Sequence, residues 1–63
     1  MQMTLKAARV NKGLTQEDVA KAIKVSKKTV WAWENGKSSP RLSKIDPLCE
    51  LLGLSYDNIR WEN

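Results

Sequence analysis

The chain of 63 residues contains no histidine and a single cysteine, Cys49. Without histidine, the Ser-His and Cys-His pairs of nucleophilic enzymes are excluded, and a Cys/His zinc site is untenable. Cys49 falls on the apolar face of a predicted helix, where a buried structural thiol is expected. Asp46 and Glu50 lie one helical turn apart, but a solvated helix face explains them more simply than a metal site. We therefore predict a protein that is not an enzyme and that needs no cofactor.

Long apolar runs are also missing from the sequence. No stretch is long or apolar enough to span a membrane, and the N-terminus lacks the apolar run of a signal peptide. One cysteine cannot form a disulfide within the chain, and it fits a reducing compartment, so we expect a cytoplasmic protein. A chain this short buries only roughly 60% of its unfolded surface, so it requires tightly packed helices or a partner.

Positive charge is concentrated in the middle of the sequence. Residues 21–44 contain seven Lys or Arg and one acid, which gives a net charge of +6. Residues 1–20 sum to +1 and residues 45–63 to −3, which accounts for the total of +4. A basic centre followed by an acidic end favours one face that meets a polyanion. Charge alone leaves open the simpler interpretation of a solvated lysine-rich surface.

Cap residues and apolar spacing predict an all-α domain of five short helices. The hydroxyls of Thr4, Thr15 and Ser26 are candidate N-caps, and Thr15 with Asp18 resembles a capping box. Glycines are expected to end helices, since they adopt positive φ without a Cβ clash. The first three predicted helices cover residues 4–12, 15–24 and 26–35.

The start of the fourth helix has two readings. Either Ser43 caps it and Pro47 lies in the first turn, or Asp46 caps a helix that begins at Pro47. Both readings end the helix at Gly53. A fifth helix is predicted over residues 55–59, with Tyr56 and Ile59 pointing inward.

The third predicted helix has two different faces. Its inward face carries Val30, Trp33 and Glu34. Its alternation of valine, tryptophan and alanine would also suit a strand, but the serine cap, the Asn-Gly end and the lack of a partner strand favour a helix. A helix with a basic first turn and an apolar far face suits the major groove of DNA. Its outward face carries Lys27, Lys28, Trp31 and Ala32.

These residues resemble the phage repressor/Cro-type (XRE-like) helix-turn-helix family. The resemblance runs from Leu5 to Ile59, and it implies a five-helix repressor-like domain over residues 1–63 whose helix-turn-helix unit covers about 15–36. The element WENGK followed by a proline is quite specific. The matching residues are Leu14-Thr15-Gln16, Val19-Ala20, Val25-Ser26, Thr29-Val30, Trp33-Glu34-Asn35-Gly36-Lys37, Pro40 and Leu52-Gly53-Leu54-Ser55.

The resemblance also implies a role for individual residues. Gln16 would meet a DNA phosphate, and the lesser alternative is a first-turn residue in water. Arg9 and Glu34 match an ion pair that joins the first helix to the end of the third. Apart from the resemblance, the positive charge of Arg41 is expected to help neutralise DNA phosphates. Contacts to bases or backbone are implied for Ser26, Lys27, Lys28 and Ala32, and contacts along a phosphate strand for Asn35, Lys37 and Ser38.

Two positions depart from the family pattern. Lys24 stands where the turn usually has glycine, so a turn of the usual shape requires a positive φ at Lys24, at a cost of roughly 1 kcal/mol. Trp31 stands where the family usually has a small or polar side chain. It could touch thymine methyls or sugar in the groove, cover the edge of the core, or anchor a protein partner.

The sequence therefore predicts a sequence-specific double-stranded DNA-binding regulator, of repressor type, that reads DNA with residues 26–35. One module offers a small interface, so a homodimer through the C-terminal region, with Ile59 and Trp61 as contacts, is expected. The alternative is a protein-interaction module on the same fold, such as an antitoxin or adaptor. The chain could also be the DNA-binding fragment of a longer regulator.

Overall fold

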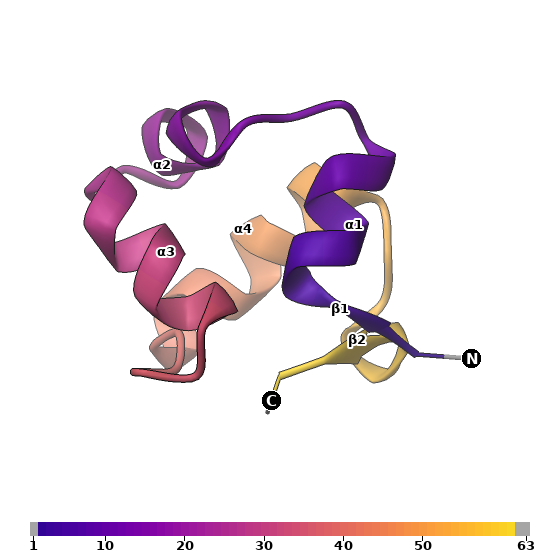
Figure 1. The fold of residues 1–63 in the computed structure, drawn as a ribbon. Coiled ribbons are helices and arrows are strands. Elements are labelled where there is room, and N and C mark those ends of the chain that lie inside the picture. The colour runs from indigo at the N-terminus through magenta and orange to yellow at the C-terminus, as the bar shows by residue number, and fades with distance from the viewer. Residues whose placement is uncertain (1, 62–63) are drawn as a thin grey trace.

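A computed structural model describes residues 2–61 of the chain. Within them lie four α-helices, one 3₁₀ turn and two very short strands. Figure 1 shows α2 and α3 on one side, α1 with both strands on the other, and α4 behind and between them. In chain order the elements are β1 (Met3–Thr4), α1 (Leu5–Asn11), α2 (Gln16–Ile23), α3 (Lys27–Glu34), α4 (Leu42–Leu52), η1 (Tyr56–Asn58) and β2 (Ile59–Arg60).

The core draws on all four helices and on the second strand. Leu48 at the centre of α4 is 0% exposed, and Val30 on α3 and Ile59 on β2 are each 1% exposed. Burying an aliphatic side chain of this size contributes roughly 1.5–3 kcal/mol. The full set of buried apolar residues is Leu5, Ala8, Val19, Ala20, Ile23, Val30, Trp33, Leu48, Leu52 and Ile59.

The three predicted N-caps are confirmed. The side chain of Thr4 accepts from the Ala7 N–H, and that of Ser26 accepts from the Thr29 N–H. Thr15 forms a complete capping box with Asp18, because each side chain accepts from the other residue's backbone N–H. Such caps satisfy donors that have no partner within the helix, and each stabilises its helix by about 1 kcal/mol.

The capping box makes stability depend on pH. The N–H of Thr15 donates to the Asp18 carboxylate at 2.8 Å, and this bond lowers the pKa of Asp18 below its ordinary value. A lowered folded pKa means that the carboxylate stabilises the fold above about pH 4, and that this contribution is lost as pH falls through the folded pKa.

Asp18→Asn keeps an acceptor for Thr15 but removes the titrating charge. We expect this variant to be less stable than the wild type at neutral pH, and to approach the wild-type stability as pH falls below about 4. Urea unfolding midpoints measured across this range check the prediction. A stability difference that stays constant with pH would contradict it.

The fourth helix begins earlier than either sequence reading allowed. It starts at Leu42, and Arg41 occupies the N-cap position without a side-chain cap bond. Ser43 therefore lies inside the first turn, and Pro47 lies inside the helix rather than in its first turn. The Lys44 N–H donates to the Arg41 carbonyl at 2.8 Å, so a backbone bond closes this turn in place of a cap.

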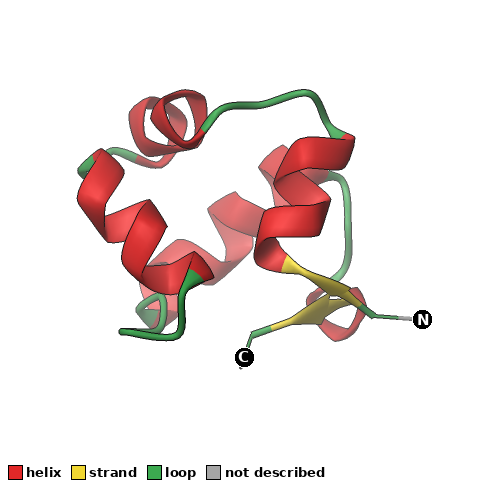
Figure 2. Cartoon of the chain, viewed as in Figure 1, coloured by secondary structure: helices red, strands yellow, loops and turns green. Residues whose placement is uncertain are grey.

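The predicted fifth helix is wrong. Residues Tyr56–Asn58 form a single 3₁₀ turn, and the chain then becomes extended at Ile59. The sequence did not indicate the two short strands, in which Met3 pairs with Ile59 and Thr4 with Arg60 in parallel register. Figure 2 shows the two short strands side by side. Backbone bonds to the first strand therefore replace a final helical turn.

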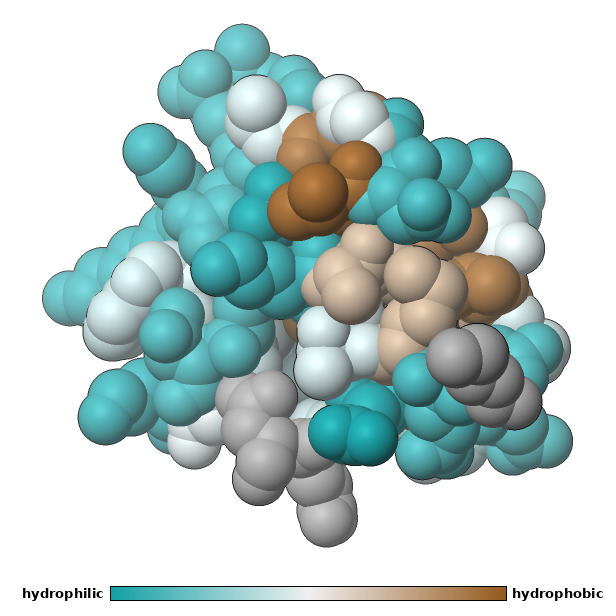
Figure 3. Space-filling model, turned by 45° about the vertical axis from the view of Figure 1, so that its right-hand side comes forward, coloured by the Kyte–Doolittle hydropathy of each residue, from teal (hydrophilic) through white to brown (hydrophobic). Residues whose placement is uncertain are grey.

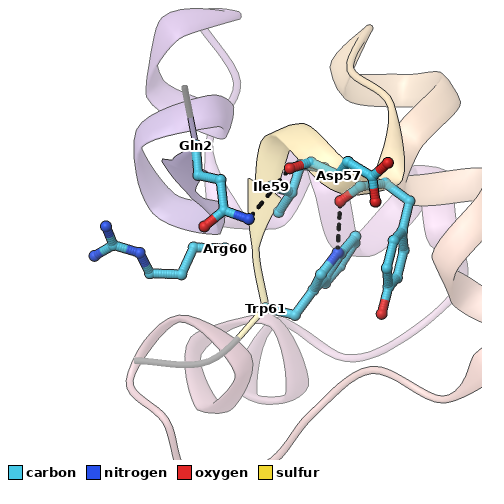
Figure 4. A pocket seen from close by; sticks show the side chains of 6 residues that line it. Gln2, Asp57, Ile59, Arg60 and Trp61 are labelled. Carbon is cyan, nitrogen blue, oxygen red and sulfur yellow. Dashed lines mark hydrogen bonds between the residues drawn. The ribbon is translucent and has the colours of Figure 1, made fainter.

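The C-terminal aromatic residues also differ from expectation. Tyr56, expected to point inward, is 56% exposed and stacks on Trp61 with ring centroids 5.5 Å apart. Trp61, expected as a dimer contact, packs against the core, and its Nε1–H donates to the Tyr56 carbonyl at 3.1 Å. Figure 4 shows this group together with Gln2, whose amide reaches the Asp57 carbonyl.

Candidate nucleic-acid interface

The turn between α2 and α3 sets the angle between the two helices. Lys24 ends α2 with φ 64° and ψ 48°, the left-handed conformation expected at this position. It is the one non-glycine residue with positive φ in the described part of the chain. The Lys24 and Val25 N–H groups both donate to the Ala20 carbonyl, which closes the end of α2. The turn thus has the expected left-handed shape, which is strained at Lys24 because this residue has a Cβ atom.

Helix α3 has the two faces that its sequence predicts. Val30 is 1% and Trp33 7% exposed, and both pack in the core. Trp31, on the other face, is 46% exposed, so it does not cover the core edge completely. Lys27 and Lys28 are exposed in the first turn.

The electrostatics of the α3 start favour an anion. The first turn contains two lysines and no acidic residue. The N-terminus of a helix already carries partial positive charge, so two cations there are unfavourable in the protein alone. A phosphate placed against this turn would neutralise them and accept from the helix N–H groups. The arrangement therefore suits a polyanion better than water.

A buried ion pair ties α1 to the end of α3. Arg9 Nε lies 2.6 Å from Glu34 Oε2, and Arg9 Nη2 donates to Glu34 Oε1 at 3.1 Å. The Arg9 side chain is 11% exposed and that of Glu34 1%. Arg9 Nη1 also donates to the Leu14 carbonyl, which fixes the connection that leads into α2. This pair is the family ion pair that the resemblance implies.

Gln16 joins the same network from the first residue of α2. Its Nε2 donates to Glu34 Oε1 at 3.1 Å, and the residue is half-buried rather than freely solvated. An amide nitrogen has two N–H donors, so a second one is left for an anion outside. Glu34, at the end of α3, thus holds the Gln16 side chain at the start of α2.

The segment after α3 forms the edge of the candidate interface. Asn35 Nδ2 donates to the Trp31 carbonyl at 2.8 Å, and Gly36, with φ 71°, turns the chain so that the Lys37 N–H reaches the Ala32 carbonyl. A cavity of about 410 Å³ opens between α3 and this segment. It is lined by Val25, Thr29, Trp33, Ser38, Ser39, Arg41 and Lys44.

The structure places the ten residues expected to meet DNA on or near the surface. Gln16 and Ala32 are half-buried, and the others are exposed. Ser26 is engaged as the α3 cap and lies 2.8 Å, Oγ to Oγ1, from Thr29. Sequence reasoning missed Thr29 and Lys44, which line the same cavity as Arg41. The exposed eight are Ser26, Lys27, Lys28, Trp31, Asn35, Lys37, Ser38 and Arg41.

The side of the molecule that carries α1 has a different character. Figure 3, turned toward α1 and the chain ends, shows apolar residues gathered in the middle of the face with polar residues around them. Val10 on α1 is 58% exposed. At the chain ends, a shallow cavity of about 300 Å³ is lined by Tyr56, Asp57, Arg60 and neighbouring residues. The basic turn of α3 and this apolar area are therefore separate surfaces.

Ile59 cannot serve as a contact in the expected homodimer. It is 1% exposed, because β2 pairs with β1 and turns this side chain into the core. Trp61 is half-buried against Tyr56, so only part of its ring faces outward. Of the two predicted contacts only Trp61 is left, and it stacks on the exposed Tyr56 ring.

Catalytic and metal-binding groups are sparse in the part of the chain that the structure describes. No group of three or more His, Cys, Asp or Glu residues lies close enough there to hold a metal ion. Cys49 is half-buried. Burial raises the pKa of its thiol, and the nearby negative charge of Asp46 raises it further. The nucleophilic thiolate is therefore disfavoured. Among residues 2–61, no helix is both long and apolar enough to cross a membrane.

Comparison with known proteins agrees with this geometry. Over 46 residues the chain is 41% identical to the cryptic phage CTXphi transcriptional repressor RstR of Vibrio cholerae, which covers 73% of this chain and 41% of that repressor. Over 59 residues it is 37% identical to an uncharacterised HTH-type transcriptional regulator of Methanocaldococcus jannaschii, covering 94% of this chain and 89% of the relative. The chain thus spans about two fifths of the phage repressor's length. A family model described as helix-turn-helix matches residues 5–59, and the chain belongs to this helix-turn-helix family.

Proposed function

We propose that this chain is a sequence-specific double-stranded DNA-binding transcriptional regulator of repressor type, with residues 1–63 acting as one DNA-binding domain. The observation that carries the proposal is the α3 helix, which buries Val30 and Trp33 while its first turn exposes Lys27 and Lys28. Similarity to a phage transcriptional repressor supports it. A regulator works where the DNA is, which agrees with the expected cytoplasmic location.

Affinity in this proposal comes mainly from the phosphate backbone. Lys37 and Arg41 on the segment after α3, together with a lysine of the α3 start, neutralise phosphates, and helix N-termini add their dipoles. Gln16 donates its second amide hydrogen to a phosphate, held in place by Glu34. The exposed side chains of Asn35 and Ser38 lie along the same phosphate strand. These contacts position α3 without reading sequence.

Specificity comes from the outward face of α3. A lysine at position 27 or 28 can donate to guanine O6 and N7, the commonest kind of base contact in the major groove. Trp31, 46% exposed one turn further along, offers an apolar surface to thymine methyl groups or sugar. Ala32 is small enough for the helix to approach the bases closely, and Ser26 begins the helix at the backbone.

A single module of this size offers a limited interface, so we infer that two copies bind a two-fold DNA site. Half-sites would then be spaced by about one helical turn, roughly 34 Å. The aromatic pair of Tyr56 and Trp61 is the candidate contact, now without Ile59.

Selection of bound duplexes from a random-sequence pool tests the function. We expect an enriched sequence that contains a two-fold repeat and that binds far more tightly than random duplex, as specific sites typically do by 10³-fold or more. If the protein binds duplexes of the pool but no sequence is enriched, the result would contradict sequence-specific binding. An enriched asymmetric site would oppose the dimer but keep the DNA-binding function.

Trp31 favours one second candidate, a protein-interaction module such as an antitoxin or adaptor. Exposed tryptophan on a helix is the residue type that dominates interface hot spots. Replacing Lys27 and Lys28 separates the two functions. The loss of these charges would weaken DNA binding, whereas a protein partner held by Trp31 would still bind.

A further inference from the structure

One side-chain hydrogen bond ties α4 to the end of α2. Lys44 Nζ donates to the Ile23 carbonyl oxygen at 3.1 Å, across 21 positions of sequence. Ile23 is the last residue of α2, and the carbonyls of a final helical turn lack partners within their own helix. Lys44 is half-buried, so this is not a freely solvated lysine. The bond satisfies a carbonyl group beside the turn that leads into α3.

The charge of Lys44 is unfavourable in its own helix but favourable at α2. Lys44 lies in the first turn of α4, which contains no acidic residue. A cation there is opposed by the positive end of the α4 dipole. The same cation lies at the negative end of the α2 dipole, where it is stabilising. Electrostatics therefore favour this side chain reaching across to α2.

The carbonyl that Lys44 holds belongs to the strained turn itself. The Ile23 C=O is part of the peptide group that joins Ile23 to Lys24, and rotation about the next bond is the φ of Lys24. That angle is 64° in a residue with a Cβ, which the left-handed region disfavours. Backbone bonds from Lys24 and Val25 to the Ala20 carbonyl hold one side of the turn. Lys44 holds the other side.

Beside this bond, α2 and α4 leave a groove at the surface. The groove has a volume of about 320 Å³ and is lined by Ala22, Ile23, Pro47, Glu50 and Leu51. The Ile23 side chain itself is buried, so the Lys44 bond adds a polar tie at the edge of an apolar contact.

We propose that Lys44 is a positioning residue for DNA reading: it holds the left-handed turn at Lys24, and with it the angle of α3, without contacting DNA. The inference rests on the proposed DNA-binding function. It explains how a lysine is tolerated at the turn position that favours glycine. It also gives Lys44 a different role from Lys37 and Arg41, which are proposed to contact phosphates directly.

Lys44→Met removes the donor and keeps the length of the side chain. We expect affinity for the duplex selected from the random pool to fall about tenfold, while the slope of log K against log salt stays at the wild-type value. Lys44→Arg, which keeps the donor, should recover most of the affinity. Lys6→Met on α1 is the matched control for net charge, and it should leave affinity nearly unchanged.

Two outcomes of the affinity measurement on Lys44→Met would overturn the proposal. A salt slope that becomes shallower by about 0.9 would make Lys44 a phosphate ligand, and an unchanged affinity would leave it no role. A glycine at the turn should make the tie less important. We therefore expect Lys44→Met to lose less affinity in a Lys24→Gly background, and equal losses in the two backgrounds would contradict coupling through the turn.

Amide hydrogen exchange of the DNA-free protein tests the same contact independently. In Lys44→Met the Val25 amide should exchange faster relative to core amides such as Leu52, because the turn opens more often. Unchanged Val25 exchange would overturn the proposal. If the wild type selects no duplex, the proposed function fails, yet this exchange measurement still decides whether Lys44 holds the turn.

Discussion

Replacing Glu34 with alanine is expected to lower the free energy of unfolding by about 3–5 kcal/mol. The carboxylate is 1% exposed and accepts from both Arg9 and Gln16. Its removal leaves the Arg9 guanidinium, itself only 11% exposed, without its counter-charge. For a domain of this size, such a loss corresponds to a fall in melting temperature of roughly 12–40 °C. Thermal and urea unfolding followed by circular dichroism measure it.

The double variant Arg9→Met/Glu34→Leu distinguishes two contributions to stability. One is the cost of leaving the Arg9 charge unpaired, and the other is the net stabilisation by the ion pair. Well-packed apolar residues often replace a buried ion pair with little loss, so we expect the double variant to be clearly more stable than Glu34→Ala. A Glu34→Ala variant that melts within a few degrees of the wild type would show that the pair is not structurally important. Because Gln16 loses its anchor, folded Glu34 variants should also bind DNA more weakly.

Replacing Lys27 and Lys28 together with alanine is expected to reduce affinity for the selected duplex by about 100-fold or more. One of these lysines is proposed to neutralise a phosphate and the other to contact guanine, a contact that is worth roughly 1–3 kcal/mol. With about four phosphates neutralised in the wild type, the slope of log K against log salt should be near −3.6 per chain. The double variant should give about −2.7. Fluorescence anisotropy over a salt series measures both quantities.

The matched control for this variant is Lys6→Ala/Lys12→Ala, which removes the same charge from exposed positions on and beside α1. It should change affinity far less. Folding should survive the loss of Lys27 and Lys28, since two cations at the start of α3 oppose the helix dipole. Intact DNA binding by the double variant, with loss of a protein partner, would instead support the interaction-module function.

Local chemistry explains why most of the helices could be predicted from the sequence. Thr4, Thr15 and Ser26 cap helices through their own side chains, so each boundary is encoded within a few residues. The inward position of Trp33 and the outward position of Trp31 follow from the helical period. The family pattern even places the positive φ at Lys24, although lysine itself disfavours it.

The failures come from contacts between distant parts of the chain. In the first turn of α4, the Lys44 side chain bonds to the Ile23 carbonyl of α2, and no local cap signal could indicate that contact. The last residues looked helical because Tyr56 and Ile59 share a spacing of three, but pairing with β1 at the other end of the chain overrides it. The exclusion of Ile59 from any dimer contact follows from that same pairing.

The pairing of β1 with β2 also constrains the order in which the chain folds. It joins Met3 to Ile59, so nearly the whole chain forms the loop that must close. Closing a flexible loop of this length costs roughly 3–4 kcal/mol of chain entropy, more than two short strands regain by themselves. Helix formation shortens the path between the two strands, so we expect this contact to form late in folding.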